Sequence, residues 1–171
     1  MLKAVVDSNA NAQEKAVDAL ITLEKKLPRV FEGVASELVP KLIEKAFGQL
    51  KVKGKAQSIM IRTIEAYKVE DIIEQLAKGC THKQPKIAGA SAECVRMAVE
   101  KLGVKPLGAA ATKTVIKLSV SLFNSTVQPV RAEGLPLASS LFKCIGAGLR
   151  SSYDDLRPAQ QKELDDALAA L

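Results

Sequence analysis

The chain has 171 residues, a formal net charge of +6 and 47% hydrophobic residues, but only 4% aromatic residues and no tryptophan. This length supports one domain or one run of repeats, and a core of Ala, Leu, Ile and Val without large rings suits closely packed helices. The three cysteines, Cys80, Cys94 and Cys144, are odd in number and widely spaced, which argues against a disulfide framework or a zinc ribbon; we expect small buried thiols.

Apolar residues recur at spacings of three and four from end to end, and this pattern predicts an all-α chain. The predicted helices cover residues 11–27, 29–47, 56–67, 69–78, 85–102, 106–123, 129–152 and 159–171. We expect Asn9 or Asn11 to cap the first helix, Pro40 to kink the second and Pro85 to open the fifth. The lysine-rich run 49–55 is expected to be a basic turn.

Two similar turns, QPKI at residues 84–87 and QPVR at residues 128–131, stand about 44 residues apart and each precedes a predicted helix. A helix pair repeated about every 40 residues is typical of an α-solenoid of HEAT or armadillo type. In such a stack, alternate turns lie on the same edge. One edge should present residues 7–9, 51–55, 82–86 and 125–131, and the opposite edge residues 25–29, 68, 103–106 and 153–158.

The apolar stripes of these helices predict one continuous core. We expect its members to be Leu20, Leu42, Ile64, Ile73, Val95, Ile116, Leu141 and Ile145. No stretch approaches the roughly 18 apolar residues of a transmembrane helix, and no secretory leader is evident, so we expect a cytosolic protein. The basic balance favours an anionic partner: nucleic acid, an acidic membrane face or an acidic protein surface.

Four segments resemble the TOG domains of the microtubule polymerase family, in the order that this family shows. They are VVDSNA at residues 5–10, KGCTHKQPKI at 78–87, VRAEG at 130–134 and LRPAQQKEL at 156–164, and the turn HKQPKI is the most specific of them. The resemblance covers nearly the whole chain and is closest to a first or second TOG domain of an array. It implies a paddle of HEAT repeats that holds one unpolymerised, curved αβ-tubulin dimer along one edge.

Carried onto this sequence, the resemblance also implies which residues face tubulin. These would be Val6, Asp7, Ser8, Asn9, Lys53, Lys55, Lys83, Lys86 and Arg131. It further implies a monomeric, non-catalytic module without a cofactor, located in the cytoplasm at the cytoskeleton, that is, at microtubules, the centrosome or the spindle.

The sequence departs from the family at one point. The family's first repeat carries a tryptophan that packs on β-tubulin, and this chain has no tryptophan. Loss of an interface tryptophan typically costs about 2 kcal/mol, or about thirtyfold in affinity. We therefore expect residues 1–171 to form a single TOG-like domain that lacks the first repeat and is incomplete at both ends.

Other functions have less support from the residues. No glycine-rich phosphate loop follows a strand, and His82, the only histidine, has no partner for metal binding or catalysis and is expected to be a turn residue. A helical-repeat scaffold that binds RNA is the main alternative, but two tyrosines and four phenylalanines provide no stacking platform for bases. A scaffold that binds peptides along a concave face is the third possibility.

Overall fold

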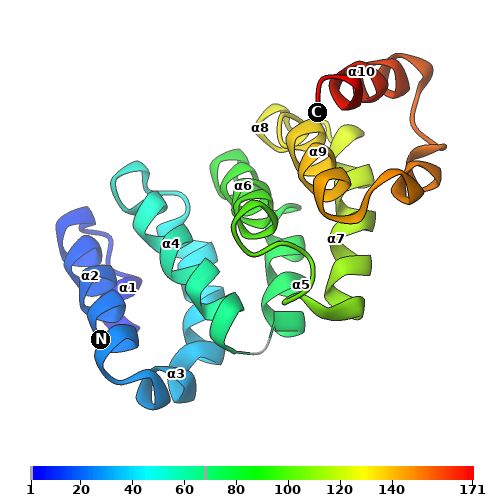
Figure 1. Ribbon diagram of the computed structural model, residues 1–171. Helices are drawn as coiled ribbons and strands as arrows, with labels where there is room; N and C mark the ends of the chain where they lie inside the picture. The colour runs from blue at the N-terminus through cyan, green and yellow to red at the C-terminus, as the bar shows by residue number, and fades with distance from the viewer. Residues whose placement is uncertain (1, 68) are drawn as a thin grey trace.

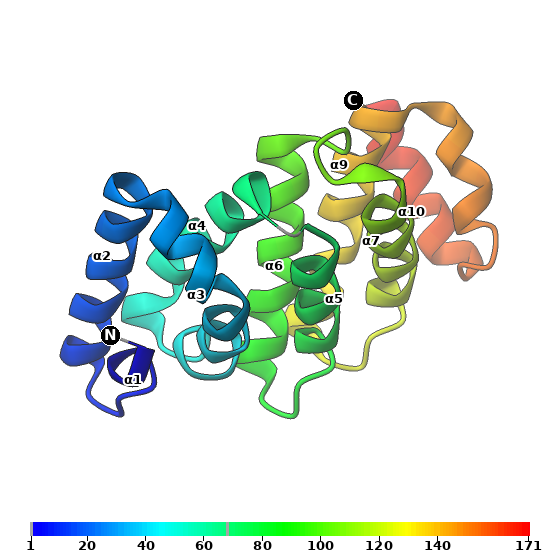
Figure 2. The ribbon, with the colours of Figure 1, turned by 90° about the horizontal axis from the view of Figure 1, so that it is seen from below.

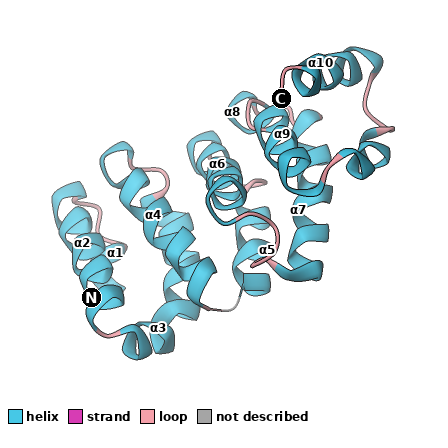
Figure 3. Cartoon of the chain, in the orientation of Figure 1, coloured by secondary structure: helices cyan, strands magenta, loops and turns pink. Residues whose placement is uncertain are grey.

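The computed structural model describes residues 2–67 and 69–171, and every regular element in these ranges is helical (Figure 3). In chain order the elements are α1 (Leu2–Val5), α2 (Ala10–Lys26), α3 (Pro28–Lys41), the π-helix η1 (Leu42–Ala46), α4 (Leu50–Ala66), α5 (Val69–Gly79), α6 (Pro85–Leu102), α7 (Gly108–Phe123), α8 (Gln128–Arg131), α9 (Gly134–Ile145), the 3-10 helix η2 (Ala147–Tyr153) and α10 (Pro158–Ala169). The predicted all-α class is confirmed.

The sequence explains where the helices begin. The Asn9 side chain accepts hydrogen bonds from the backbone N–H groups of Asn11 and Ala12, so Asn9 is the N-cap of α2. Prolines take the first position of α3, α6 and α10, where the missing N–H has no helical partner to lose. The α3 helix passes through Pro40 and widens into η1, where the Phe47 N–H donates to the Leu42 carbonyl.

The helices form two layers that follow one another along the stack (Figures 1 and 2). In the first layer α2 contacts α4, α4 contacts α6, α6 contacts α8 and α9, and α9 contacts α10. In the second layer α3 contacts α5, α5 contacts α7, and α7 contacts η2. Each element therefore packs on its neighbours in the stack, as expected for HEAT-like helix pairs.

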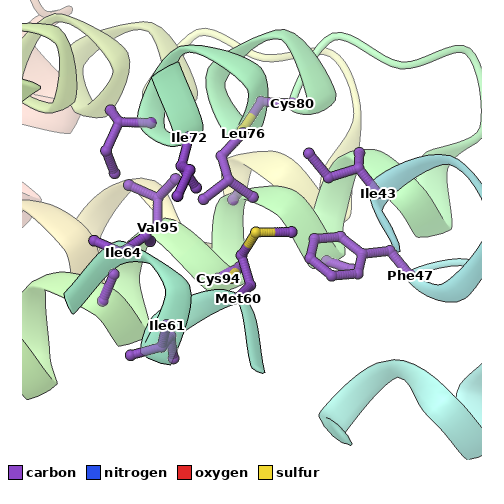
Figure 4. Packing of buried hydrophobic residues seen from close by; sticks show 14 of the residues in the cluster. Ile43, Phe47, Met60, Ile61, Ile64, Ile72, Leu76, Cys80, Cys94 and Val95 are labelled. Carbon is purple, nitrogen blue, oxygen red and sulfur yellow. The ribbon is translucent and has the colours of Figure 1, made fainter. Parts of the chain in front are cut away.

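The core lies between the two layers. In the middle of the stack it joins side chains from η1, α4, α5 and α6 and from the residues that directly follow η1 and α5 (Figure 4): Ile43, Phe47, Met60, Ile61, Ile64, Ile72, Leu76, Cys80, Cys94 and Val95. Burial raises the pKa of the Cys80 thiol to about 12 and raises that of Cys94 further, so both sulfurs stay protonated and pack as small apolar groups. Cys144 is exposed, contrary to the prediction that all three thiols are buried.

The predicted basic turn at residues 49–55 is wrong, because α4 begins at Leu50 and includes all three lysines of the run. Val52 and Ala56 are fully buried one helical turn apart, and this apolar spacing extends the helix toward its N-terminus. Lys51, Lys53 and Lys55 thus project from the first two turns of a helix.

The predicted helix 129–152 is also wrong: it is divided into α8, α9 and η2. Gly146 has φ +90°, a left-handed conformation that ends α9 and that side chains rarely adopt. The chain consequently reverses at Gly146, and Ile145, expected in the core, is 39% exposed. Ile116 is only partly buried, whereas the other six predicted core residues are buried.

The early reversal also changes the edge on which residues 153–158 lie. The Gln160 Nε2 donates to the carbonyl of Phe123 at 2.8 Å, which joins the start of α10 to the end of α7. Residues 154–157 therefore lie on the same edge as residues 124–127, not on the opposite one. Lys68, also expected on the opposite edge, lies outside the described residues.

Candidate functional site: one edge of loops

The loops at residues 6–9, 47–49, 80–84, 124–127 and 154–157, with the first turns of the helices that follow them, form one edge of the stack, here called the loop edge (lower side in Figure 2). Three contacts join its neighbours. Lys51 Nζ lies 2.6 Å from Asn11 Oδ1, Gly48 packs against Ile87, and Gly89 packs against Pro129. The shared edge that the sequence predicts is therefore present, with the addition of loop 154–157.

The first loop is held by its own side chains. Asp7 Oδ1 accepts from the Asn9 backbone N–H at 2.8 Å, while Asn9 caps α2. Asp7 and Asn9 thus fix the loop conformation, and Val6 and Ser8 are exposed beside them. A partner at this loop would meet Val6 and Ser8 with little cost in loop ordering.

Lys53 and Lys55 are committed to contacts between repeats. Lys55 Nζ bridges Asp18 and Glu14 of α2 at 2.8 and 2.9 Å, and Lys53 Nζ lies 2.8 Å from Glu93 Oε2 of α6. Hydrogen bonds to Asp18 and then Glu14 raise the pKa of Lys55. Burial alone would raise the pKa of Glu93, but hydrogen bonds from Lys53 and Gln57 hold it below its ordinary value.

These contacts belong to a ladder of ion pairs that ties the first-layer helices together. Arg62 of α4 pairs with Glu24 of α2 at 2.7 Å, and Arg96 of α6 pairs with Glu133 at 2.6 Å just before α9. Burial alone would lower the pKa of Arg96, but its hydrogen bonds to Glu133 and Glu100 raise it. These ion pairs join neighbouring helices of the first layer.

Lys83 and Lys86 differ from the α4 lysines. Both are exposed in and after loop 80–84, and neither forms an ion pair with any of the described residues. His82 holds this turn, because its Nδ1 accepts from the Gln84 backbone N–H at 3.0 Å, so it is a turn residue as predicted. The two ammonium groups are thus available to an acidic partner on a loop of fixed shape.

The Arg131 side chain forms one hydrogen bond with the residues that the structure describes. Its Nη1 donates to the Ser125 carbonyl at 2.7 Å, so the guanidinium closes loop 124–127 from the first turn after it. The other nitrogen atoms of this exposed side chain remain for a partner. Arg131 is therefore both a loop brace and a candidate contact.

Two exposed residues of the loop edge were missed by the sequence analysis. Leu50, the first residue of α4, is 90% exposed and lines a hollow of about 460 Å³ together with Lys53, Lys86 and Pro129. The sequence does contain a signal for Leu50: this leucine does not lie on the apolar stripe that Val52 and Ala56 form on the same helix. Arg157 was assigned to the opposite edge because the reversal at Gly146 was not foreseen.

The loop edge is an exposed surface on which side chains from successive repeats lie side by side. Across residues 2–67 and 69–171, no group of three His, Cys, Asp or Glu side chains is placed to hold a metal ion. None of the helices in these ranges is long and apolar enough to cross a membrane. The loop edge presents a row of exposed polar and basic side chains, with the exposed apolar side chains of Val6 and Leu50 among them.

Several known proteins are similar to this chain in sequence, and several solved structures are similar to it in fold. The mini spindles protein of Drosophila melanogaster is 31% identical over 166 residues, which is 96% of this chain and 8% of that protein. The MOR1 protein of Oryza sativa subsp. japonica is 28% identical over 170 residues, or 98% of this chain and 8% of that protein. The chain thus spans less than a tenth of the length of these relatives.

Solved structures with the same fold include the N-terminal domain of MAST/Orbit, with a TM-score of 0.85 at 20% identity, covering 99% of this chain and 76% of that one. A second structure is from a study of tubulin recruitment by microtubule polymerases with TOG domain arrays. It has a TM-score of 0.84 at 22% identity, and the match covers 99% of this chain and 37% of that one. The family model of the XMAP215/Dis1/CLASP TOG domain matches residues 1–168. The chain belongs to this family of TOG domains.

Proposed function

We propose that this chain is a non-catalytic module that binds soluble, curved αβ-tubulin through its loop edge. Family membership supports this, as do similar structures from studies of TOG–tubulin binding specificity and of tubulin recruitment by TOG domain arrays. The observation that carries the proposal is the pair Lys83 and Lys86. Both are exposed and form no ion pair with the described residues, and they lie on a turn held by His82 and on the first turn of the helix that follows it. These two lysines, together with Val6, Ser8 and Arg131, would contact the outer surface of tubulin.

In this proposal Asp7, Asn9, Lys53 and Lys55 act mainly by positioning the loop edge. Lys53 and Lys55 would have to exchange Glu93, Glu14 and Asp18 for carboxylates of tubulin, and such an exchange of exposed ion pairs brings little net energy. Lys83, Lys86 and Arg131 need no such exchange, so they are the stronger candidates for direct contact.

Binding of RNA receives no support from the placement of the aromatic residues. The four phenylalanines and Tyr153 are buried, and Tyr67 is partly buried with its hydroxyl on the Pro28 carbonyl, far from the loop edge. Single-stranded bases stack on exposed aromatic rings, and the described surface offers none. The basic side chains alone would give only salt-sensitive, sequence-independent attraction.

The test is a titration of the labelled chain with unpolymerised tubulin, repeated with an excess of single-stranded RNA as competitor. We expect a saturable one-to-one complex that RNA does not displace. Displacement by RNA, or equal binding to both, would show that the chain responds to negative charge in general and would overturn the proposal.

Leu50 provides a prediction specific to this chain. We expect Leu50→Ser to lower tubulin affinity about tenfold, because burying a leucine side chain contributes about 1.5–3 kcal/mol and serine removes most of that. Thermal stability should be unchanged, since Leu50 is 90% exposed. The matched control is Leu27→Ser, the same change at a 53% exposed leucine on the opposite edge. Equal losses in the two variants would exclude Leu50 as an anchor.

We further propose that the parent protein acts at microtubules, the centrosome or the spindle. The names of its relatives support this, among them mini spindles, a centrosomal protein of Dictyostelium discoideum and the spindle pole body component alp14 of Schizosaccharomyces pombe. Imaging of the tagged full-length protein together with labelled microtubules tests it, and a distribution independent of microtubules would contradict it.

A further inference from the structure

A second surface of the molecule has the features of a binding groove, away from the loop edge. It is a hollow of about 680 Å³ that is lined mainly by residues of α7. This helix belongs to the second layer (Figure 2). Its apolar lining includes Val104, Ile116 and Val120, and its basic lining comprises Lys105, Lys113 and Lys117. All three lysines are exposed.

The charge on this groove is not balanced locally. None of the residues that line it is acidic, and Lys105, Lys113 and Lys117 form no ion pair with any residue that the structure describes. The first layer is different, since its lysines and arginines at the repeat contacts are held by glutamates. Three uncompensated cations beside apolar side chains favour a ligand that is both anionic and apolar.

The shape of the groove follows from the helix beneath it. Its α7 lining residues recur at spacings of three and four from Gly108 to Val120, so they occupy one side of the helix over about 18 Å. Beyond α7, the reversal at Gly146 leaves the short 3-10 helix η2, which supplies only Ser152 to the lining. A full-length helix following α9 would cover more of this side.

We propose that this groove binds an acidic amphipathic helix of about three turns from a partner protein. The partner's apolar residues, at positions i, i+3, i+4 and i+7, would pack on Ile116, Val120 and Val104. Its Glu or Asp side chains, on either side of that stripe, would meet Lys105, Lys113 and Lys117. This site is independent of tubulin binding at the loop edge, so both partners can be held at once.

The apolar lining distinguishes this ligand from a purely anionic one. A nucleic acid or a polyglutamate tail would satisfy the lysines but would leave Ile116 and Val120 without a packing partner. An acidic helix buries both kinds of side chain in one contact, and a preformed helical shape matches the straight side of α7. The lysines then orient the helix and the apolar contacts supply most of the affinity.

The experiment uses a fluorescent synthetic peptide of about 14 residues, Leu and Glu placed at helical spacing, and follows its anisotropy as the chain is added. A peptide of identical composition with scrambled spacing is the ligand control. We expect saturable binding of the amphipathic peptide and at least tenfold weaker binding of the scrambled one. Equal binding of the two peptides would overturn the proposal, because net charge alone would then explain both.

Two variants locate the site. Lys113→Glu with Lys117→Glu should weaken the peptide at least tenfold, and Ile116→Ser should weaken it about fivefold with little change in salt dependence. Lys25→Glu with Lys26→Glu, which changes net charge equally on another surface, should leave it within twofold. Binding of anionic phospholipid vesicles through Lys113 and Lys117 without binding of the peptide would also overturn the proposal. Tubulin affinity should be unchanged in the groove variants, which separates this test from that of the loop edge.

Discussion

Gly89→Val is expected to lower the free energy of unfolding by about 3 kcal/mol, and thereby the Tm by about 10 °C. A Cβ on Gly89 would lie 2.7 Å from Pro129 Cβ and 3.5 Å from the Pro129 carbonyl carbon. The proline ring and the backbone at the start of α8 are stiff, so the helices themselves must separate. The same separation would increase the distance between loops 80–84 and 124–127, and tubulin affinity should fall by more than the unfolded fraction explains.

Gly33→Val provides the matched control. Gly33 lies within α3, and, beyond its chain neighbours and the backbone of its own helix, no described atom lies within 4 Å of the position that a Cβ would take. Valine has a slightly higher helix propensity than glycine, so we expect the free energy of unfolding to change by no more than about 0.5 kcal/mol. Thermal and urea unfolding monitored by circular dichroism measure both variants. Similar stability of the two would contradict the close approach of α6 and α8.

The architecture follows from local signals that are strong in this sequence. Proline at 85 and 158 and the cap at Asn9 mark helix starts, and the apolar spacing between them marks the buried faces. Because each HEAT-like pair contacts only its neighbours, correct local elements almost determine the stack. The repeated QPKI and QPVR turns then place their loops on one edge.

The errors arise where a tertiary contact or a backbone conformation decides the outcome. The lysines that alternate with other residues at 51–55 predict a turn, yet the segment is helical: Val52 is fully buried and Lys55 pairs with Glu14 and Asp18 of α2. The positive φ of Gly146 divides the seventh predicted helix, and composition alone does not distinguish it from Gly89 inside α6.

The candidate site residues could likewise be predicted only in part. Sequence and resemblance indicate which residues lie on the loop edge, but they do not show which side chains are already engaged within the chain. Lys53 is held by Glu93 and Arg131 by the Ser125 carbonyl, whereas Lys83 and Lys86 have no comparable contact among the described residues. The two members of such an ion pair lie about 40 residues apart in the chain, as Lys53 and Glu93 do. Only the packed structure identifies them as partners.

Reversing Lys83 of loop 80–84 and Lys86 in the first turn of α6, Lys83→Glu with Lys86→Glu, is expected to lower the affinity for soluble tubulin at least tenfold. An exposed charge pair contributes about 0.5–1 kcal/mol, and reversal replaces each attraction by a repulsion of similar size, so the two sites together change binding by about 2–4 kcal/mol. The folded state should be unaffected, because both side chains are exposed and form no ion pair with the described residues. Titration of fluorescent tubulin at two salt concentrations measures the effect.

Lys25→Glu with Lys26→Glu is the matched control, because both lysines are exposed at the end of α2 on the opposite edge and the net charge changes by the same amount. We expect this variant to bind tubulin within twofold of the unmodified chain. The difference between the two double variants should shrink as salt rises, since rim charges are screened over about 8 Å at physiological ionic strength. Equal weakening by both would mean that tubulin responds to overall basicity, and the loop edge would then lose its assignment as the binding surface.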